Sequence, residues 1–216
     1  KNLKLQRYYK FKNSIIPKQF QNQHYYNKRY NLFSKYDQNI QLDEEMLFSV
    51  CPEYNAKHEA VFLHNLYKQQ QEDKNKIQNP RPILLDLFGG VGGFAIQLAA
   101  FFRVFTVELQ PERCQMILHN SKIYEKDITV VQGDCFEQKQ LLDAVNPEIV
   151  TISPPWGGIH YKRAKFNIDE LVIGDKKFID IFNVVTASIV YVVLPKDYVG
   201  KINDQYIWEN RDCGCF

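Results

Sequence analysis

The sequence predicts an α/β fold, a doubly wound and mostly parallel sheet preceded by a small helical N-terminal extension. Three observations support this prediction. The 216 residues are 45% hydrophobic and 24% charged, as in an ordinary globular domain. After Pro82, short apolar runs alternate with amphipathic segments, which is typical of βαβ units. The first of these runs leads directly into a turn rich in glycine.

The N-terminal part of the chain separates into three segments. Residues 1–22 are basic and polar without a sustained period, and we expect a flexible lead-in. Residues 23–67 have a mostly helical period with a break near Asp37, which predicts a helical extension. The polar residues 68–82, closed by two prolines, predict a linker or loop. The core then spans residues 83–216.

Five strands and four helices are predicted in the core. The strands are apolar runs at 83–88, 103–108, 128–131, 148–152 and 188–194. The helices are amphipathic segments at 93–102, 111–124, 137–145 and 176–185. Pro111 suits the first turn of its helix, and β-branched residues favour a strand in the last apolar run. Because crossovers between parallel strands are right-handed, this order predicts a doubly wound sheet.

Composition excludes several classes of protein. No apolar run approaches the roughly 20 residues that cross a bilayer, and no secretory leader is visible, so no membrane partner is expected. The five cysteines lack the CxxC spacing of zinc sites, and we predict reduced, packed thiols and no metal. Because the sequence begins with Lys1, we expect a piece of a longer chain.

Charge is unevenly distributed along the chain. The net charge is +2, but residues 1–40 contain nine Lys or Arg and one acid. Aromatic residues are interleaved with these cations, so this basic arm can follow a polyanion and stack on bases. The alternative is a solvated lead-in whose aromatic rings dock on the domain, which we favour for residues 1–22.

A nucleoside site is predicted where the first three core strands end. The residues concerned are Asp86, Gly89, Gly90, Gly92, Glu108 and Asp134. The glycines allow the backbone to approach a ligand closely, and the next helix presents its N–H groups there. Glu108 can accept the ribose hydroxyls, and Asp134 lies where the adenine edge would fall. Each signal alone is weak, since an acid after a strand is commonly a helix cap.

The end of the fourth strand points to the chemistry. Gly90 and Gly92 also satisfy the loose fingerprint of NAD-binding proteins. However, residues 153–158 read Ser-Pro-Pro-Trp-Gly-Gly, where open α/β sheets bind ligands. Ser153 and the Pro154 carbonyl can accept hydrogen bonds from a planar amine, while Trp156 offers a stacking face. This clamp favours methylation of an exocyclic base amine. The alternative is a rigid turn with a core tryptophan.

At these motifs the chain resembles the trimethylguanosine synthase family. The matching segments are 29–37, 40–43, 48–53, 86–93, 153–158 and 189–195, within residues 24–197. The resemblance implies a class I, Rossmann-like methyltransferase dependent on S-adenosyl-L-methionine. It implies methylation of the 2-amino group of the 7-methylguanosine cap of small nuclear and nucleolar RNAs, giving 2,2,7-trimethylguanosine. It also implies a nuclear location, in the nucleolus or Cajal-like bodies, and a cytoplasmic pool is also considered.

The same resemblance implies roles for individual residues. The implied catalytic residues are Ser153, Pro154 and Trp156. The implied cofactor-binding residues are Phe33, Pro52, Glu53, Asp86, Gly89, Gly90, Gly92, Glu108 and Asp134. The implied substrate-binding residues are Ser153, Pro155, Trp156, Lys196 and His24, the last two at the cap phosphates. No metal ligand is implied.

The sequence also departs from the family pattern. Glu108 stands for Asp, Phe94 for Asn, Cys51 for Thr, His24 for Lys and Lys196 for Arg. Lysine keeps the charge of arginine but loses its bidentate geometry, so weaker binding of phosphates is expected. Residues 208–216 do not match the family, and we expect truncated C-terminal strands.

Two alternative functions remain open from the sequence. The first is another nucleobase-amine methyltransferase that acts on adenine in DNA or RNA, or on guanine in ribosomal RNA. This alternative explains the clamp but not the matching segment from Phe33 to Glu53. The second is a catalytically weak cap-binding module.

Overall fold

A five-stranded parallel sheet forms the centre of the computed structural model, which describes residues 23–74, 79–156, 166–195 and 198–200. The strands lie in the order β3-β2-β1-β4-β7, and every neighbouring pair is parallel. They span Ile83–Leu87 (β1), Arg103–Glu108 (β2), Ile128–Gln132 (β3), Ile149–Ile152 (β4) and Ile189–Val192 (β7). The chain changes direction across the sheet between β1 and β4, so the predicted doubly wound fold is confirmed.

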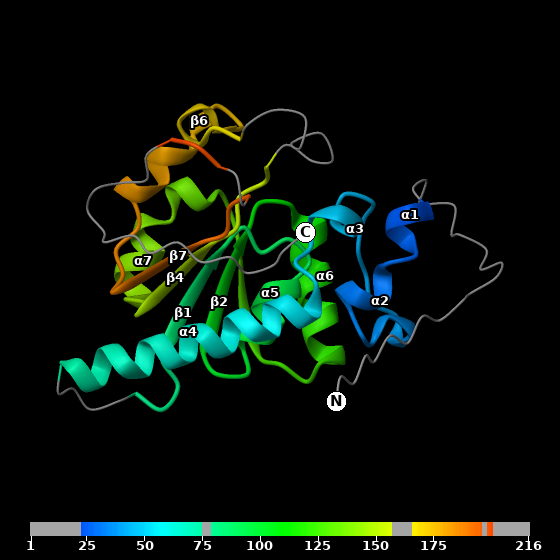
Figure 1. The fold of residues 1–216 in the computed structure, drawn as a ribbon, viewed down its shortest axis with the longest axis horizontal. Helices are drawn as coiled ribbons and strands as arrows, with labels where there is room; N and C mark the ends of the chain where they lie inside the picture. Colours follow the sequence, from blue (N-terminus) through cyan, green and yellow to red (C-terminus); the bar gives the residue numbers. More distant parts are fainter. Residues whose placement is uncertain (1–22, 75–78, 157–165, 196–197, 201–216) are drawn as a thin grey trace, which may run out of the picture.

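Helices cover both faces of this sheet (Figure 1). One face carries α4 (Glu53–Asp73), α5 (Gly93–Leu98) and α6 (Pro111–Ile123). The other face carries α7 (Lys139–Val145) and the 3₁₀ helix η5 (Phe178–Asn183). Two shorter 3₁₀ helices are η2 (Cys135–Glu137) and η4 (Ile168–Glu170), and a small antiparallel hairpin pairs β5 (Val172–Ile173) with β6 (Lys176–Lys177).

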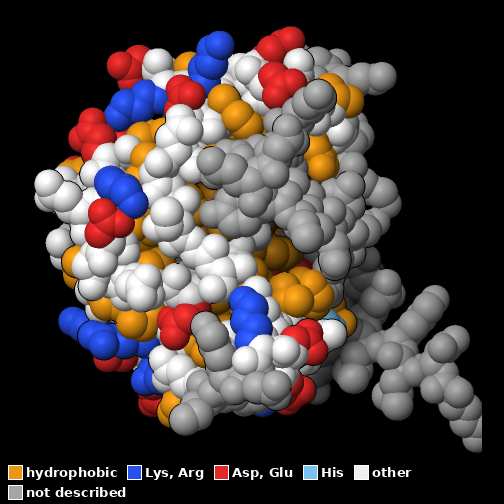
Figure 2. All heavy atoms as spheres, turned by 90° about the vertical axis from the view of Figure 1, so that its left-hand side faces the viewer, with side chains coloured by type: hydrophobic (Ala, Val, Ile, Leu, Met, Phe, Trp, Pro, Cys, Tyr) orange, Lys and Arg blue, Asp and Glu red, His pale blue; other side chains and the backbone are white. Residues whose placement is uncertain are grey.

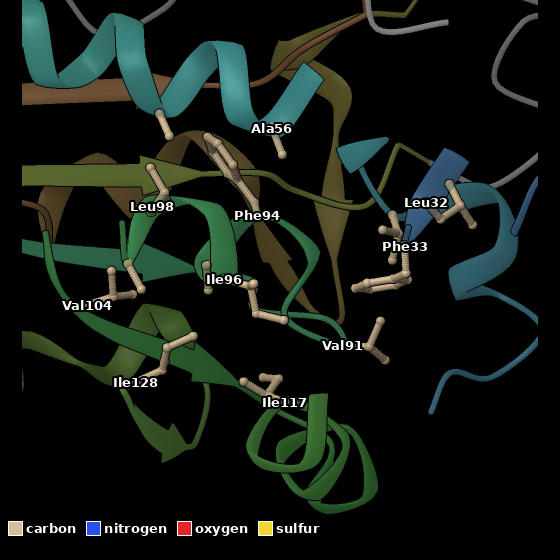
Figure 3. Close-up of a cluster of buried hydrophobic side chains, with 14 of the residues drawn as sticks. Leu32, Phe33, Ala56, Val91, Phe94, Ile96, Leu98, Val104, Ile117 and Ile128 are labelled. Atoms are coloured by element: carbon tan, nitrogen blue, oxygen red, sulfur yellow. The ribbon is translucent and has the colours of Figure 1, made fainter. Parts of the chain in front are cut away.

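The helical extension lies beyond α6, at the end of the molecule away from β7 (Figure 1). It consists of α1 (Gln23–Tyr26), α2 (Arg29–Leu32), η1 (Tyr36–Gln38) and α3 (Met46–Ser49). Figure 3 shows that Leu32 and Phe33 at its base lie near Val91, in the same cluster as the core of α5 and α6. The extension therefore shares its hydrophobic core with one face of the sheet.

The strands are buried on both faces, as parallel strands usually are. Leu84 packs into the cluster under α4 to α6, whereas Leu85 packs into the cluster on the opposite face. In Figure 3, Phe94 is directed from α5 toward α4, near Ala56. Burial of these apolar side chains on two faces fixes the carboxyl edge of the sheet relative to its helices.

Two predicted segments differ from the structure. Helix α4 continues to Asp73, so the linker predicted from residue 68 begins too early, because Lys, Gln and Glu are good helix formers. The helix predicted over 176–185 is wrong. Lys176 and Lys177 form β6 after a turn at Gly174, which has a φ of +65°, so the following 3₁₀ helix can begin only at Phe178. Predictions on residues 1–22 and 201–216 lie outside the described residues.

The described residues bear on the expectations about membrane spans, metal ligands and cysteines. Among the described residues, no helix is both long and apolar enough to span a membrane, and no group of three potential metal-binding side chains gathers. Figure 2 shows cationic and anionic side chains mixed over one face of the molecule. Of the cysteines that the structure describes, Cys114 and Cys135 are buried, as expected of packed thiols, whereas Cys51 is partly exposed.

Candidate functional site at the carboxyl edge of the sheet

The glycine turn joins β1 to α5 through left-handed backbone. Phe88, Gly90 and Gly92 have φ angles of +76°, +57° and +88°. Residues with a Cβ atom rarely adopt this left-handed region, whereas glycine adopts it readily. A Cβ atom at Gly89 would lie 2.5 Å from Thr106 Oγ1, so this glycine is required by the close approach of β2. Gly89 and Gly92 are buried, and Phe88 and Gly90 are the partly exposed residues of the turn. Phe88 holds a strained conformation of the kind found at functional sites.

Asp86 lies beneath this turn and braces three strands. It is in register with Thr106 on β2 and Thr151 on β4, and both hydroxyls donate to its carboxylate, at 3.0 and 2.7 Å. Asp86 is 1% exposed, and burial raises its pKa to about 6 despite these hydrogen bonds. Its carboxylate is thus engaged within the protein, and the predicted contact with a cofactor stays a prediction.

Glu108 ends β2 and ties the glycine turn to that strand. One carboxylate oxygen accepts a hydrogen bond from the Gly90 N–H at 2.8 Å, and the other accepts one from Gln110 N–H at 2.9 Å. Glu108 is 7% exposed, so most of its surface faces protein. The structure therefore brings Glu108 and the turn together, and each oxygen retains a second lone pair for a ligand hydroxyl.

Asp134 lies next to Glu108, in the loop that follows β3. The Gly133 N–H donates to the Glu108 carbonyl at 3.0 Å, which joins the two loops. Asp134 accepts a hydrogen bond from the Phe136 N–H at 2.9 Å and pairs with Lys176 at 2.7 Å. Burial raises the pKa of Asp134, but the hydrogen bonds from Lys176 and the Phe136 N–H lower it by more than burial raises it. The net pKa therefore lies below its ordinary value.

The proline-rich clamp continues β4 at the same edge. The Ser153 N–H donates to the Leu87 carbonyl at 3.4 Å, so the clamp starts beside the end of β1. Pro154 is buried, Pro155 is exposed, and Trp156 is half-buried. The Trp156 indole N–H donates to the Val193 carbonyl at 3.1 Å, just beyond β7. The ring thus packs partly against the core while part of it stays accessible. Gly157 and Gly158 lie outside the described residues.

The extension covers the glycine turn from the other side. A Cβ atom at Gly93 would lie 2.6 Å from Val50 Cγ1, and one at Gly90 would lie 3.2 Å from Met46 Sδ. Phe33 is 1% exposed and packs near Tyr124, with 6.3 Å between their ring centroids. The end of α3 therefore lies directly on the turn, and Phe33 Cζ, 3.7 Å from the Cβ position of Gly93, packs against the same glycine. The prediction that Phe33 covers a cofactor stays a prediction.

Glu53 begins α4 and joins the extension to α6. Its carboxylate accepts hydrogen bonds from Ser34 N–H at 2.6 Å, Ser34 Oγ at 2.9 Å and Tyr124 Oη at 2.7 Å, and it pairs with Lys57. Burial raises its pKa, but the bonds from Lys57, Ser34 and Tyr124 outweigh burial, and the net pKa is lowered. Pro52 precedes it as the N-cap residue, without a side-chain cap.

Two pockets of about 490 Å³ each open beside Glu53, and both are lined by Ser34, Glu53 and Lys57. Pro52 lines the second. These pockets show that Glu53 and Pro52 lie near accessible space, but the lining residues do not include the glycine turn. The prediction that the two residues border a cofactor therefore stays a prediction.

The structure describes one of the two predicted phosphate-binding residues. His24 is exposed on α1, in edge contact with Tyr25 at 5.3 Å between ring centroids. Lys196 lies outside the described residues. Their proposed contacts with a substrate stay predictions.

Sequence reasoning missed the residues that attach the extension to the core. Asn120 on α6 is 0% exposed, donates to the carbonyls of Gln41 and Val91, and accepts from the Gln41 N–H at 2.8 Å. Arg113 on α6 pairs with Asp43 at 2.7 Å and with Glu45. A polar residue on the buried side of a helix, three positions after Ile117, is the signal that could have identified Asn120.

The family model and the curated relatives that match this chain describe the same family. A family model described as RNA cap guanine-N2 methyltransferase matches residues 81–202. A trimethylguanosine synthase from Schizosaccharomyces pombe is 31% identical over 68% of this chain, and one from Saccharomyces cerevisiae is 34% identical over 64%. The matched regions span 59% and 42% of those proteins. Among solved structures, a tRNA (uracil-54, C5)-methyltransferase from Pyrococcus abyssi is 26% identical, covering 47% of this chain and 23% of its own, with a TM-score of 0.31.

Proposed function

This chain belongs to the RNA cap guanine-N2 methyltransferase family, and we propose on that premise that it methylates the exocyclic 2-amino group of 7-methylguanosine-capped RNA. The proposed substrates are small nuclear and nucleolar RNAs, and the product is a 2,2,7-trimethylguanosine cap. One observation carries the proposal: the glycine turn, Glu108, Asp134 and the clamp that starts at Ser153 share one edge of the sheet.

The cofactor is S-adenosyl-L-methionine, and the residues at this edge fit it. Gly90 and Gly92 allow backbone to approach the ligand, while Glu108 and Asp134 present carboxylates from adjacent strand ends. We assign the ribose hydroxyls to Glu108 and the adenine 6-amino group to Asp134. Asp86 would support this cradle from beneath. When bound, the cofactor supplies a methyl group on a positively charged sulfur.

The residues of the clamp orient the amine that receives the methyl group. Ser153 and the Pro154 carbonyl would accept hydrogen bonds from the 2-amino group, which aims its lone pair and eases the rise of positive charge on nitrogen. Holding the reacting atoms about 3–3.5 Å apart lowers the activation free energy by several kcal/mol. A strong general base is unnecessary in this scheme, because the methylated amine becomes acidic.

Trp156 gives selectivity for the cap in this proposal. Methylation at position 7 makes the guanine ring cationic, and a cation over an indole face gains roughly 0.5–2 kcal/mol. Pro155, His24 and Lys196 would contact the rest of the cap and its phosphates. Nucleolar or Cajal-like staining of a tagged chain would support the proposed nuclear location, and exclusion from the nucleus would contradict it.

A methyl-transfer assay with three acceptors tests the proposed function. Labelled S-adenosyl-L-methionine is incubated with 7-methylguanosine diphosphate, with GDP and with adenine-containing oligonucleotides. We expect transfer to the 7-methylated nucleotide alone. Transfer only to adenine would identify another nucleobase-amine methyltransferase. Binding of 7-methylguanosine diphosphate without transfer would identify a cap-binding module.

A further inference from the structure

The β5–β6 hairpin brings a lysine onto the loop after β3. Val172–Ile173 and Lys176–Lys177 pair antiparallel around Gly174, and η5 follows immediately. This hairpin lies between β4 and β7 in the sequence, whereas Asp134 follows β3. The tertiary fold therefore joins Lys176 to a distant segment of the chain, at the edge of the sheet that carries the proposed adenine contact.

Lys176 contacts three side chains of the segment that follows β3. Its ammonium lies 2.7 Å from an Asp134 carboxylate oxygen, 3.0 Å from a Glu137 carboxylate oxygen and 5.6 Å from the centroid of the Phe136 ring. The other Asp134 oxygen accepts the Phe136 N–H at 2.9 Å. Both oxygens of Asp134 are thus held, one by the backbone and one by the hairpin, which fixes the orientation of the carboxylate.

The ion pair of Lys176 and Asp134 is only partly exposed to solvent. The positive charge of Lys176 favours the ionised form of Asp134. The side chains of Lys176 and Asp134 are 30% and 31% exposed. Without the ammonium between them, the carboxylates of Asp134 and Glu137 would repel each other. A hydrogen bond to an ionised acceptor is stronger than one to a neutral acceptor, and each carboxylate oxygen accepts two bonds. Lys176 therefore leaves Asp134 able to accept a further donor.

We propose that Lys176 is a positioning residue for adenine recognition: it holds Asp134 in the orientation that receives the 6-amino group of the cofactor. The inference rests on the proposed function, because the contact between Asp134 and adenine is itself part of that proposal. It makes the β5–β6 hairpin a wall of the cofactor site.

Calorimetric titration with two ligands separates this role from a merely structural one. S-Adenosylhomocysteine carries the 6-amino group, whereas S-inosylhomocysteine carries a 6-oxo group in its place. Lys176→Met should weaken binding of the adenosine ligand by about fivefold and change binding of the inosine ligand little, which lowers the preference between them. Lys176→Arg should restore the preference, because it keeps the charge.

Lys177→Met is the matched control, because Lys177 is the exposed neighbour on the same strand. It should bind both ligands like the unmodified chain. Equal losses for both ligands in Lys176→Met, or no loss at all, would overturn the inference while leaving the proposed function standing. If the unmodified chain binds neither ligand, the proposed function fails, and the inference fails with it.

Discussion

At the scale of single residues, Trp156 combines a structural contact with the proposed recognition of the cap. Its indole N–H is bound to the Val193 carbonyl, and its ring is half-buried against the core. The hydrogen bond fixes the ring plane relative to β4 and β7, so a stacked base would meet a preoriented surface. The side chain thus has two separate roles: its ring face is available for stacking, and its N–H holds the ring in place.

We predict that Trp156→Ala abolishes methyl transfer and leaves cofactor binding largely intact, because the stacking face is lost while the glycine turn is untouched. Trp156→Phe keeps an aromatic face without the N–H and should retain measurable transfer. Transfer is measured with 7-methylguanosine diphosphate, and binding is measured with S-adenosylhomocysteine. Loss of cofactor binding in Trp156→Ala would show that the residue is structural.

Asp86 illustrates how burial of one carboxyl group makes stability depend on pH. Its pKa is raised from 3.8 to about 6 in the folded protein, because burial disfavours the charged form. Between about pH 4 and pH 6 the folded chain therefore holds the proton more tightly than the unfolded chain. The free energy of unfolding should fall as pH rises through this window, and this contribution should level off above it.

We expect Asp86→Asn to remove this dependence. The difference in unfolding free energy between the unmodified chain and the variant should change by about 2 kcal/mol between pH 4.5 and pH 7.5, which is most of the full effect at 1.36 kcal/mol per pKa unit. Urea unfolding at pH 4.5, 5.5 and 7.5 measures this difference. Asp143→Asn, at an exposed position on α7, is the control. Parallel pH profiles for the unmodified chain and Asp86→Asn would contradict the account.

At the scale of elements, α6 attaches the extension to the glycine turn. Asn120 binds Gln41 and Val91 at once, while Arg113 pairs with Asp43 and with Glu45. Helix α3 follows these acids and packs on the turn through Met46 and Val50. Polar contacts from α6 thus attach residues 40–50, which also pack into the hydrophobic core through Met46 and Val50.

Arg113→Met should loosen residues 40–50 without unfolding the sheet. Its side chain is 11% exposed, so removal leaves two carboxylates without their cation, at an expected cost of about 1–3 kcal/mol. Hydrogen exchange should rise several-fold in this segment and stay unchanged in β1 and β2. Lys122→Met, on the exposed side of the same helix, should behave like the unmodified chain. Unchanged exchange in residues 40–50 of Arg113→Met would refute the proposed attachment.

The strands were predictable from sequence because each is a short apolar run bounded by turn residues. Glu108 was predicted to end its strand, and it is the last residue of β2. The contacts of Asp86 with Thr106 and Thr151 were not predicted, although each threonine is polar within a buried strand. They depend on strand register, and the pairing of Lys176 with Asp134 depends on a hairpin that sequence reasoning interpreted as a helix.

At the scale of the whole molecule, two proposed binding sites meet at one edge of a sheet. The proposed nucleoside cradle lies at the ends of β1, β2 and β3, and the clamp extends from β4, beside β1. This order places the proposed methyl donor and the proposed acceptor on adjacent strands. In this proposal the parallel sheet holds the methyl donor close to its acceptor, which is what in-line transfer needs.

The most direct test of this claim locates the transferred methyl group. A 7-methylguanosine-capped RNA is incubated with the chain and isotopically labelled S-adenosyl-L-methionine, digested to nucleosides, and its cap is analysed by mass spectrometry and NMR. We expect label on the exocyclic 2-amino nitrogen of the cap guanine. Label on a ring nitrogen, a ribose oxygen or another base would contradict it.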